Sequence, residues 1–257
     1  MCFDHDALPP DLPADVPRLA GGAAAELTEA TSADGTRFSV ALALSPEPQG
    51  PAVVIVPDVR GLYRFYAELA ERFAAAGHHA VAIDPFGRTA GTGEREGEWD
   101  YWPHVRETTP AQIQADVAGA IVLLRERAGA SVTSVAVVGF CFGGAQAFLA
   151  AINPDLPIDR VVGFYGALRG DRLGIPAPRA EIARARVPVL GLFGGADEGI
   201  PVGDRIEFER NLRRAGVEHE IHVYDGAPHS FFDRKQDQFA EASADAWRRT
   251  LGFLAAR

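Results

Sequence analysis

The chain has 257 residues, of which 47% are hydrophobic and 23% are charged, with a formal net charge of -10 at pH 7. This composition is ordinary for a globular protein, and the length fits a single α/β domain. The negative charge argues against nucleic acid as a partner, because such binding depends on attraction to phosphates. No stretch reaches the roughly 18 uninterrupted apolar residues of a membrane span, so no membrane association is expected.

The first twenty residues are predicted to form an irregular lead-in rich in proline and acid, followed by one domain over residues 21–257. Acids stand near the start where a secretory signal would carry bases, which predicts a cytoplasmic protein. Cys2 and Cys141 are the two cysteines of the chain. A disulfide framework is therefore not expected, and a single reduced thiol at Cys141 is the simpler prediction.

The elements that follow predict a sheet interleaved with helices. Residues 26–31 and 36–44, separated by an Asp34-Gly35 turn, predict an antiparallel hairpin. Short apolar runs then predict strands buried on both faces of a mainly parallel sheet, at residues 53–56, 80–83, 135–138, 161–164, 189–193 and 221–224. Amphipathic stretches between them predict helices at residues 65–76, 111–127, 145–152, 204–215 and 239–254. This order predicts a doubly wound α/β fold that binds ligands beyond the carboxyl ends of its strands.

Cys141 lies in the motif Gly139-Phe140-Cys141-Phe142-Gly143-Gly144, between a predicted strand and a predicted helix. This spacing is typical of a nucleophile elbow, where small residues two positions before and after the nucleophile avoid a collision. The helix N-terminus would favour a thiolate and a developing oxyanion. Taken alone, the motif is equally compatible with a buried cysteine in a tight turn.

A cysteine nucleophile needs a base and an acid that orients the base. In a fold of this kind they are expected after later strands, in the order nucleophile, acid, histidine. Asp197 follows one late apolar run, with Glu198 as its rival, and His229 follows the next run. His104 stays open as an alternative base. The remaining histidines, which are predicted to be structural, are His5, His78, His79, His219 and His222.

A metal site is not expected, because the histidine pairs lack cysteines or carboxylates at ligand spacing. Taken together, Gly-x-Cys-x-Gly-Gly, Gly-Gly-x-Asp and His-Ser-Phe resemble the dienelactone hydrolase family from about Thr36 onward. The resemblance implies an α/β-hydrolase fold and no cofactor. It also implies that Cys141 is the nucleophile, His229 the general acid and base, and Asp197 the orienting acid.

The resemblance extends to the loop after the first central strand. It implies that the backbone amides of Val59 and Phe142 form the oxyanion hole, and that Asp58 matches a family acid, typically glutamate, that contacts and activates the thiol. Asp58 is one methylene shorter, and an aspartate after a strand is often a turn or cap residue instead. Arg60 stands where the family usually has an apolar residue, and it is predicted to be a substrate contact.

Substrate contacts are the least specific part of the resemblance. Arg88 matches a family arginine that holds the substrate carboxylate, with a surface arginine as the alternative. A second family arginine matches less well, because Asp233 falls at its spacing and Arg234 follows. Tyr165 is expected to line the pocket. The long loop of residues 89–109, with Trp102, is predicted to form a lid or pocket wall, or to pack on the sheet edge.

The resemblance implies a hydrolase that cleaves a small ester or lactone, with or without a carboxylate, through an acyl-enzyme. A broad carboxylesterase or thioesterase is one alternative. A redox-responsive thiol protein that has lost hydrolysis is another, because an exposed thiol of low pKa also suits peroxide sensing. The oligomeric state is not indicated.

Overall fold

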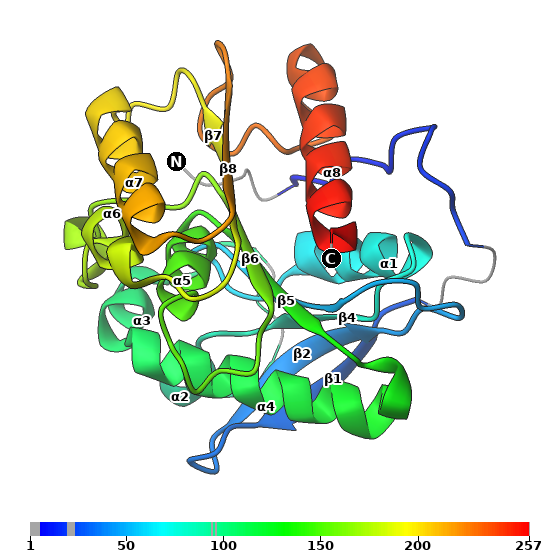
Figure 1. Cartoon of the computed structure of the whole chain (residues 1–257). Coiled ribbons are helices and arrows are strands. Elements are labelled where there is room, and N and C mark those ends of the chain that lie inside the picture. Colours follow the sequence, from blue (N-terminus) through cyan, green and yellow to red (C-terminus); the bar gives the residue numbers. More distant parts are fainter. Residues whose placement is uncertain (1–5, 20–23, 94, 96, 257) are drawn as a thin grey trace.

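The computed structural model describes residues 6–19, 24–93, 95 and 97–256. The expectations for Cys2 and His5 lie outside this part of the chain. One sheet runs through the described structure, with its strands in the order β1-β2-β4-β3-β5-β6-β7-β8 (Figure 1). The strands are β1 Glu26–Thr31, β2 Arg37–Ala43, β3 Ala52–Val56, β4 Ala80–Ile83, β5 Val135–Phe140, β6 Arg160–Phe164, β7 Val189–Gly194 and β8 His219–Tyr224.

The pairing confirms the predicted hairpin and the predicted mainly parallel sheet. β1 pairs antiparallel with β2, and β2 pairs antiparallel with β4. All pairs from β4 to β8 are parallel. The hairpin turns at Gly35, whose φ of +82° favours glycine. Parallel pairing brings the carboxyl ends of the six central and later strands to one edge of the sheet, where a site can form.

Helices cover both faces of the sheet, as the fold class requires (Figure 1). Helices α1 and α8 lie on one face, while α4, α5 and α7 lie on the other. The helices are α1 Arg64–Ala75, α2 Gly87–Ala90, α3 Trp102–Glu107, α4 Pro110–Ala128, α5 Phe142–Ala150, α6 Pro178–Glu181, α7 Val202–Ala215 and α8 Ala240–Ala255. Short 3-10 turns occur at Gly129–Ser131, Asp171–Leu173, Ile182–Arg184 and Asp237–Phe239. Among the described residues, no helix is both long enough and apolar enough to cross a membrane.

The predicted helix at residues 111–127 illustrates how local sequence sets an element. Thr109 accepts a hydrogen bond from the Gln112 N–H at 3.3 Å, and the Gln112 side chain accepts from the Thr109 N–H at 2.8 Å. Pro110 fills the first helical position, where no donor is needed. This capping box therefore defines the start of α4.

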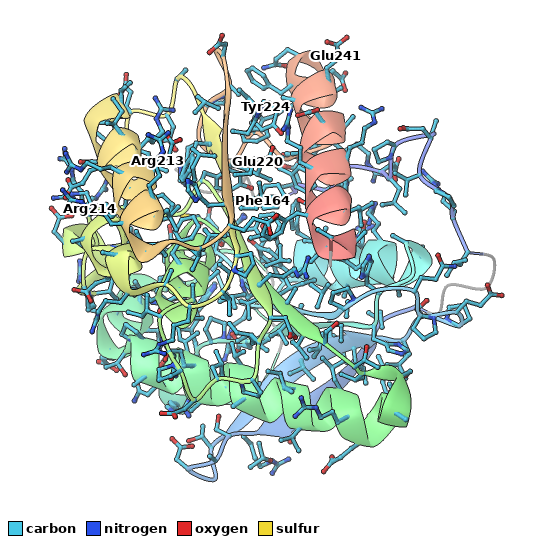
Figure 2. All side chains as sticks on the ribbon, in the orientation of Figure 1. Phe164, Arg213, Arg214, Glu220, Tyr224 and Glu241 are labelled. Atoms are coloured by element: carbon cyan, nitrogen blue, oxygen red, sulfur yellow. The ribbon has the colours of Figure 1, made fainter. Side chains whose placement is uncertain are left out.

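The strands differ in burial according to their place in the sheet. Every residue of β3, β4, β5 and β7 is buried, as their apolar sequences predict. β8 is an edge strand and is only half-buried. Its side chains Glu220 and Tyr224 lie beside α8 (Figure 2), where the Tyr224 hydroxyl donates to Asp245 at 3.0 Å. Polar contacts therefore attach α8 to the sheet edge.

The segment expected to be one long loop, residues 89–109, contains a helix. α3 begins at Trp102 and ends at Glu107, so the connection is more ordered than its composition indicated. Pro103 at the second helical position suits this start.

Residues 6–19 form no helix or strand, and they pack on the rest of the chain. Leu12 is 5% exposed, and the indole N–H of Trp247 in α8 donates to the carbonyl of Pro10 at 3.2 Å. The Leu19 N–H donates to the carbonyl of Ala75 in α1 at 2.9 Å. The described lead-in therefore covers α1 and α8.

Candidate active site

Cys141 occupies a sharp turn between β5 and α5. Its φ of +54° lies in the left-handed region, which is costly for a residue other than glycine. A Cβ atom on Gly139 would overlap the carbonyl of Gly143, and one on Gly143 would overlap the carbonyls of Val56 and Pro57. The two glycines of the motif are therefore required by backbone contact, and the thiol-bearing side chain is half-buried at the start of a helix.

Backbone strain gathers at this edge of the sheet. Among the described residues other than glycine, positive φ angles occur at Cys141, Tyr165 and Ser230, with values of 54°, 38° and 60°. These residues follow β5, β6 and β8, the last in the loop of His229. Strained residues of this kind persist where surrounding structure holds them, and they cluster at functional sites.

His229 and Asp197 form a close pair. The Nδ1 atom of His229 lies 2.6 Å from Asp197 Oδ2, and the Asp197 side chain is 2% exposed. The other oxygen, Oδ1, accepts the Gly199 N–H at 2.9 Å. With Nδ1–H donating to the carboxylate, Nε2 becomes the nitrogen that can accept a proton. Glu198 is exposed, so the structure pairs His229 with Asp197 rather than with this rival.

The end of β6 connects the elbow to the histidine. The Cys141 N–H donates to the carbonyl of Phe164 at 3.0 Å, and Figure 2 labels Phe164 at this strand end. The next residue, Tyr165, is fully buried, and its ring centroid lies 5.1 Å from that of His229. Cys141 and His229 therefore contact two consecutive residues, Phe164 and Tyr165, at the end of β6. Tyr165 therefore lies against His229, and its role in lining the substrate pocket stays a prediction.

The β3 loop, residues 57–63, lies against the start of α5. The close approach of Gly143 to Val56 and Pro57 fixes this contact. Phe142 is the first residue of α5, and Val59 is buried in the β3 loop. The arrangement brings together the two segments whose amides the resemblance assigns to an oxyanion hole.

Asp58 is fully buried and surrounded by donors. Its Oδ1 accepts the backbone N–H of Arg60 at 2.8 Å, and its Oδ2 accepts from Arg60 Nη2 and from the Tyr66 hydroxyl, each at 3.0 Å. Burial, followed by the charge of Asp58, raises the pKa of Tyr66 well above its usual value, so this hydroxyl stays protonated. The first contact is a local Asp turn, the alternative role considered for this residue. Asp58 thus organises the β3 loop.

Arg60 is 5% exposed and is held within the β3 loop. Its guanidinium carbon lies 4.2 Å from the centre of the Tyr63 ring, in addition to its pairing with Asp58. Burial opposes the charge, but the Asp58 carboxylate outweighs it and raises the pKa of Arg60. The arginine that departs from the family pattern therefore partners the shortened acid of the same loop.

Arg88 does not join this group of residues. Its Nη1 lies 2.6 Å from Asp116 Oδ2 in α4, and its Nη2 lies 2.9 Å from Asp34 Oδ2 in the hairpin turn. Ser32 also donates to Asp116. The expectation that Arg88 holds a substrate carboxylate is corrected, because two protein carboxylates already bind its guanidinium group. These contacts connect the hairpin to α4.

Trp99 proves more closely connected to the site than Trp102. The Trp99 indole N–H donates to the carbonyl of Arg60 at 3.1 Å. The Trp99 ring packs on the Phe86 ring, and their centroids lie 5.7 Å apart. The Phe86 ring stacks in turn on the Phe142 ring, with the centroids 5.9 Å apart. The Trp102 ring instead lies beside the Tyr101 ring at the start of α3, with the centroids 5.5 Å apart. Trp99 therefore packs against the β3 loop, and the role of residues 89–109 as a pocket wall stays a prediction.

Two further residues of this wall escaped sequence reasoning. Arg95 Nη2 lies 2.8 Å from Asp84 Oδ2, and the Asp84 side chain is fully buried. A Cβ on Gly61 of the β3 loop would lie 2.7 Å from Asp84 Oδ1. Asp84 thus lies beneath the β3 loop and holds the segment of Arg95 above it. An aspartate after a strand was visible in the sequence, but its partner was not.

The other described histidines have structural surroundings. His78 Nδ1 lies 2.8 Å from the carbonyl of Pro51, and His79 Nδ1 accepts the Ser45 N–H at 3.1 Å. His219 Nδ1 lies 2.9 Å from the carbonyl of Val217, and His104 packs on Trp99 at 5.1 Å. Within the described ranges, no group of three or more His, Cys, Asp or Glu side chains could hold a metal ion.

The sheet order, the helices on both faces and the strained elbow after β5 define an α/β hydrolase. The sequence model of the dienelactone hydrolase family matches residues 38–257. The chain therefore belongs to the dienelactone hydrolase family, and it is a hydrolase of this family by class.

Individual relatives agree with this assignment. The chain is 30% identical over 204 residues to a protein of Methylorubrum extorquens named "Putative carboxymethylenebutenolidase", covering 77% of this chain and 69% of that protein. An Escherichia coli K12 protein of the same name is 31% identical over 213 residues, covering 78% and 75%. A crystal structure titled "Putative Dienelactone Hydrolase" from Klebsiella pneumoniae superposes with a TM-score of 0.76 at 28% identity, covering 91% of this chain and all of that one.

Proposed function

We propose that this protein hydrolyses small esters or lactones through an acyl-enzyme intermediate on Cys141. The observation that supports this most directly is the His229–Asp197 contact of 2.6 Å beside the strand end that binds the Cys141 backbone. A buried carboxylate that accepts from Nδ1 holds the ring in place and stabilises the imidazolium that forms during catalysis.

In the proposed reaction, His229 Nε2 takes the thiol proton while sulfur forms a bond to the acyl carbonyl carbon. The amides of Val59 and Phe142 stabilise the oxyanion. Collapse of the tetrahedral intermediate breaks the carbon–oxygen bond, and His229 returns the proton to the departing alkoxide or enolate. Water then loses a proton to His229, adds to the thioester and releases the acid, and the thiol regains its proton.

The role of Asp58 in this proposal differs from that of the family acid. Its carboxylate already accepts from Arg60 and Tyr66, so we propose that it shapes the β3 loop and thereby the amide of Val59. Arg60, Tyr165 and Trp99 are proposed as walls of the substrate site. Arg88 is not included.

Activity and intact mass test the proposal together. Cys141→Ala and His229→Ala should each lose at least about a thousandfold in turnover of aryl esters and dienelactone, whereas His219→Ala on β8 should retain it. Wild type should gain the mass of one acyl group when it is mixed with an aryl ester whose acyl group leaves the cysteine slowly. Cys141→Ala should gain no such mass. Full turnover by Cys141→Ala would refute the proposal.

The alternatives from the sequence give different results in the same experiments. A redox-responsive thiol protein would form no acyl adduct but would gain oxygen or a mixed disulfide on treatment with peroxide. A broad thioesterase would prefer acyl thioesters to lactones. The cytoplasmic location and the lack of a nucleic-acid partner stay predictions, which imaging of a tagged protein and a binding assay at stated salt would check.

A further inference from the structure

β8 forms an open edge of the sheet. It pairs with β7 and stands last in the strand order, between α7 and α8 (Figure 1). The Gly195 N–H donates to the carbonyl of Tyr224 at 2.7 Å, so the even-numbered residues of β8 turn their backbone groups toward β7. The backbone groups of His219, Ile221 and Val223 therefore point outward. Within the described part of the chain, no hydrogen bond is formed to these outward groups.

β8 lacks the usual protection of an edge strand. Edge strands commonly carry a lysine, a proline or a bulge that prevents pairing with another strand. The sequence of β8, HEIHVY, contains no lysine or proline, and its register with β7 is continuous from His219 to Tyr224. Its one acid, Glu220, is paired with Arg249 of α8. β8 is therefore able to accept another strand.

The outward groups select one register for pairing with a second copy of β8. Antiparallel pairing centred on Ile221 puts this residue opposite Ile221 of the second copy, and His219 opposite Val223 of the second copy. All three outward residues of each copy then exchange hydrogen bonds. A centre one residue away would place one outward residue of each copy opposite a residue beyond the strand.

The side chains on the α8 face of β8 are complementary in this register. Glu220 lies opposite His222 of the second copy, at the distance of a cross-strand pair. Within one chain, Glu220 pairs with Arg249, and His222 Nε2 lies 3.7 Å from Asp245 Oδ2. The register therefore brings Arg249 of each copy to the level of Asp245 of the other. This arrangement is the self-complementary contact that a twofold axis requires.

The α7 face of the same edge carries exposed apolar side chains. Val202 and Ile206 of α7 are each 60% exposed. α6 lies against the other side of α7, where Arg179 contacts Asp204 and Glu207. Helical spacing places Val202 and Ile206 roughly opposite these two acids, on the side toward β8 (Figure 1). The same twofold axis sets α7 of the two copies side by side and covers this apolar pair in each.

We propose that β8, with the adjoining sides of α7 and α8, binds a second copy of this chain and joins the two sheets edge to edge around a twofold axis at Ile221. The partner is a second copy because the strand register, the charges beside α8 and the apolar pair on α7 all complement themselves about one axis. This inference does not depend on the proposed hydrolysis, because no residue that it uses takes part in the reaction.

Sedimentation velocity over a dilution series measures the dimer dissociation constant. Ile221→Lys places two like charges at the axis and should raise this constant at least about a hundredfold. Ile206→Lys changes an exposed position, so folding is retained, and the loss of its apolar contact should raise the constant about tenfold. Wild type that stays monomeric throughout the series would overturn the proposal.

Two matched variants serve as controls. Leu27 lies on β1, at the opposite edge of the sheet, and Val122 lies on α4; they are 56% and 54% exposed. Leu27→Lys and Val122→Lys make the same kind of change as Ile206→Lys and should leave the dissociation constant unaltered. A dimer lost in Leu27→Lys and kept in Ile206→Lys would place the contact on β1 and overturn the proposal.

Cysteine cross-linking tests the register itself. In a chain with Cys2→Ala and Cys141→Ala, Glu220→Cys and His222→Cys variants are prepared separately, mixed and oxidised. Opposed residues of this kind have Cα atoms about 4.5 Å apart, within the range of a disulfide. The mixture should therefore form more linked dimer, of mixed mass, than either variant alone. A sample that sediments as a dimer and yields no mixed linkage would refute the pairing of β8.

Discussion

At the scale of single residues, Asp84 has the most unusual electrostatic position. It is fully buried beneath the β3 loop, and its carboxylate lies 2.8 Å from Arg95 Nη2. Burial raises the pKa of Asp84 to about 6, although Arg95 and the amides of Leu62 and Phe86 favour the ionised form. The residue therefore changes its ionisation near pH 6, and it does so in contact with both Arg95 and the β3 loop.

This shift predicts a pH-dependent difference between wild type and Asp84→Asn. Because the folded-state pKa is raised, the proton contributes stability that is complete below about pH 4 and is lost as pH rises through about 6. Between pH 4 and pH 7, the unfolding free energy of wild type should fall by roughly 2 kcal/mol relative to the variant. Urea unfolding at several pH values measures this, and parallel pH curves would contradict it.

At the scale of elements, the site depends on how closely α5 approaches β3. The backbone of Gly143 touches the carbonyls of Val56 and Pro57, and this contact sets the β3 loop beside the helix start. The same approach explains why the elbow needs a glycine within a helix, where glycine is otherwise unfavourable. The position of the Val59 amide relative to Phe142 follows from this packing.

Two glycine-to-alanine variants should therefore have opposite effects. Gly143→Ala should lower the unfolding free energy by about 3 kcal/mol, because neither neighbouring carbonyl can yield without moving the strand, and it should lower turnover. Gly252→Ala in α8, where the new methyl group meets nothing within 4 Å, should raise stability by about 0.5–1 kcal/mol. Thermal unfolding and ester turnover compare them, and the prediction fails if both variants shift stability in the same direction.

At the scale of the whole molecule, residues 6–19 of the lead-in belong to the folded structure. It reaches the segment after His229, where the Arg234 N–H donates to the carbonyl of Leu8 at 2.9 Å. The Leu8 N–H donates to Asp233 Oδ1 at 3.1 Å, so the residue at the spacing of a family arginine instead binds this segment. Through Asp6, the lead-in also lines a pocket of about 530 Å³ together with Arg64, Arg95 and Lys235.

Substitutions in the lead-in should show which of its contacts stabilise the fold. Leu12→Ala should cost about 2–3 kcal/mol of unfolding free energy, because a buried side chain leaves a cavity against the domain. Asp15→Asn, which removes an exposed ion pair, should leave the unfolding free energy unchanged. Chemical unfolding distinguishes them. A Leu12→Ala variant as stable as wild type would show that the lead-in adds nothing to the core.

The sequence by itself determined the order along the chain of the strands and the five longest helices, the turn at Cys141 and the loops of Asp197 and His229. These follow from local causes: apolar runs that can only be buried, glycines that permit close backbone approach, and polar residues placed directly after strands. Parallel pairing then brings strand ends to one edge, so residues far apart in sequence can be predicted to share a site.

Only the tertiary structure decided which side chains pair. The sequence could not predict that Asp58 pairs with Arg60 or that Arg88 pairs with Asp34 and Asp116. It also could not predict the contact of Trp99 with the β3 loop. Long charged and aromatic side chains reach several partners, and the packing of distant segments selects among them. The pocket that Asp6 lines arises in the same way, because its residues Arg64, Arg95 and Lys235 come from three separate parts of the chain and line one cavity only when the chain is folded.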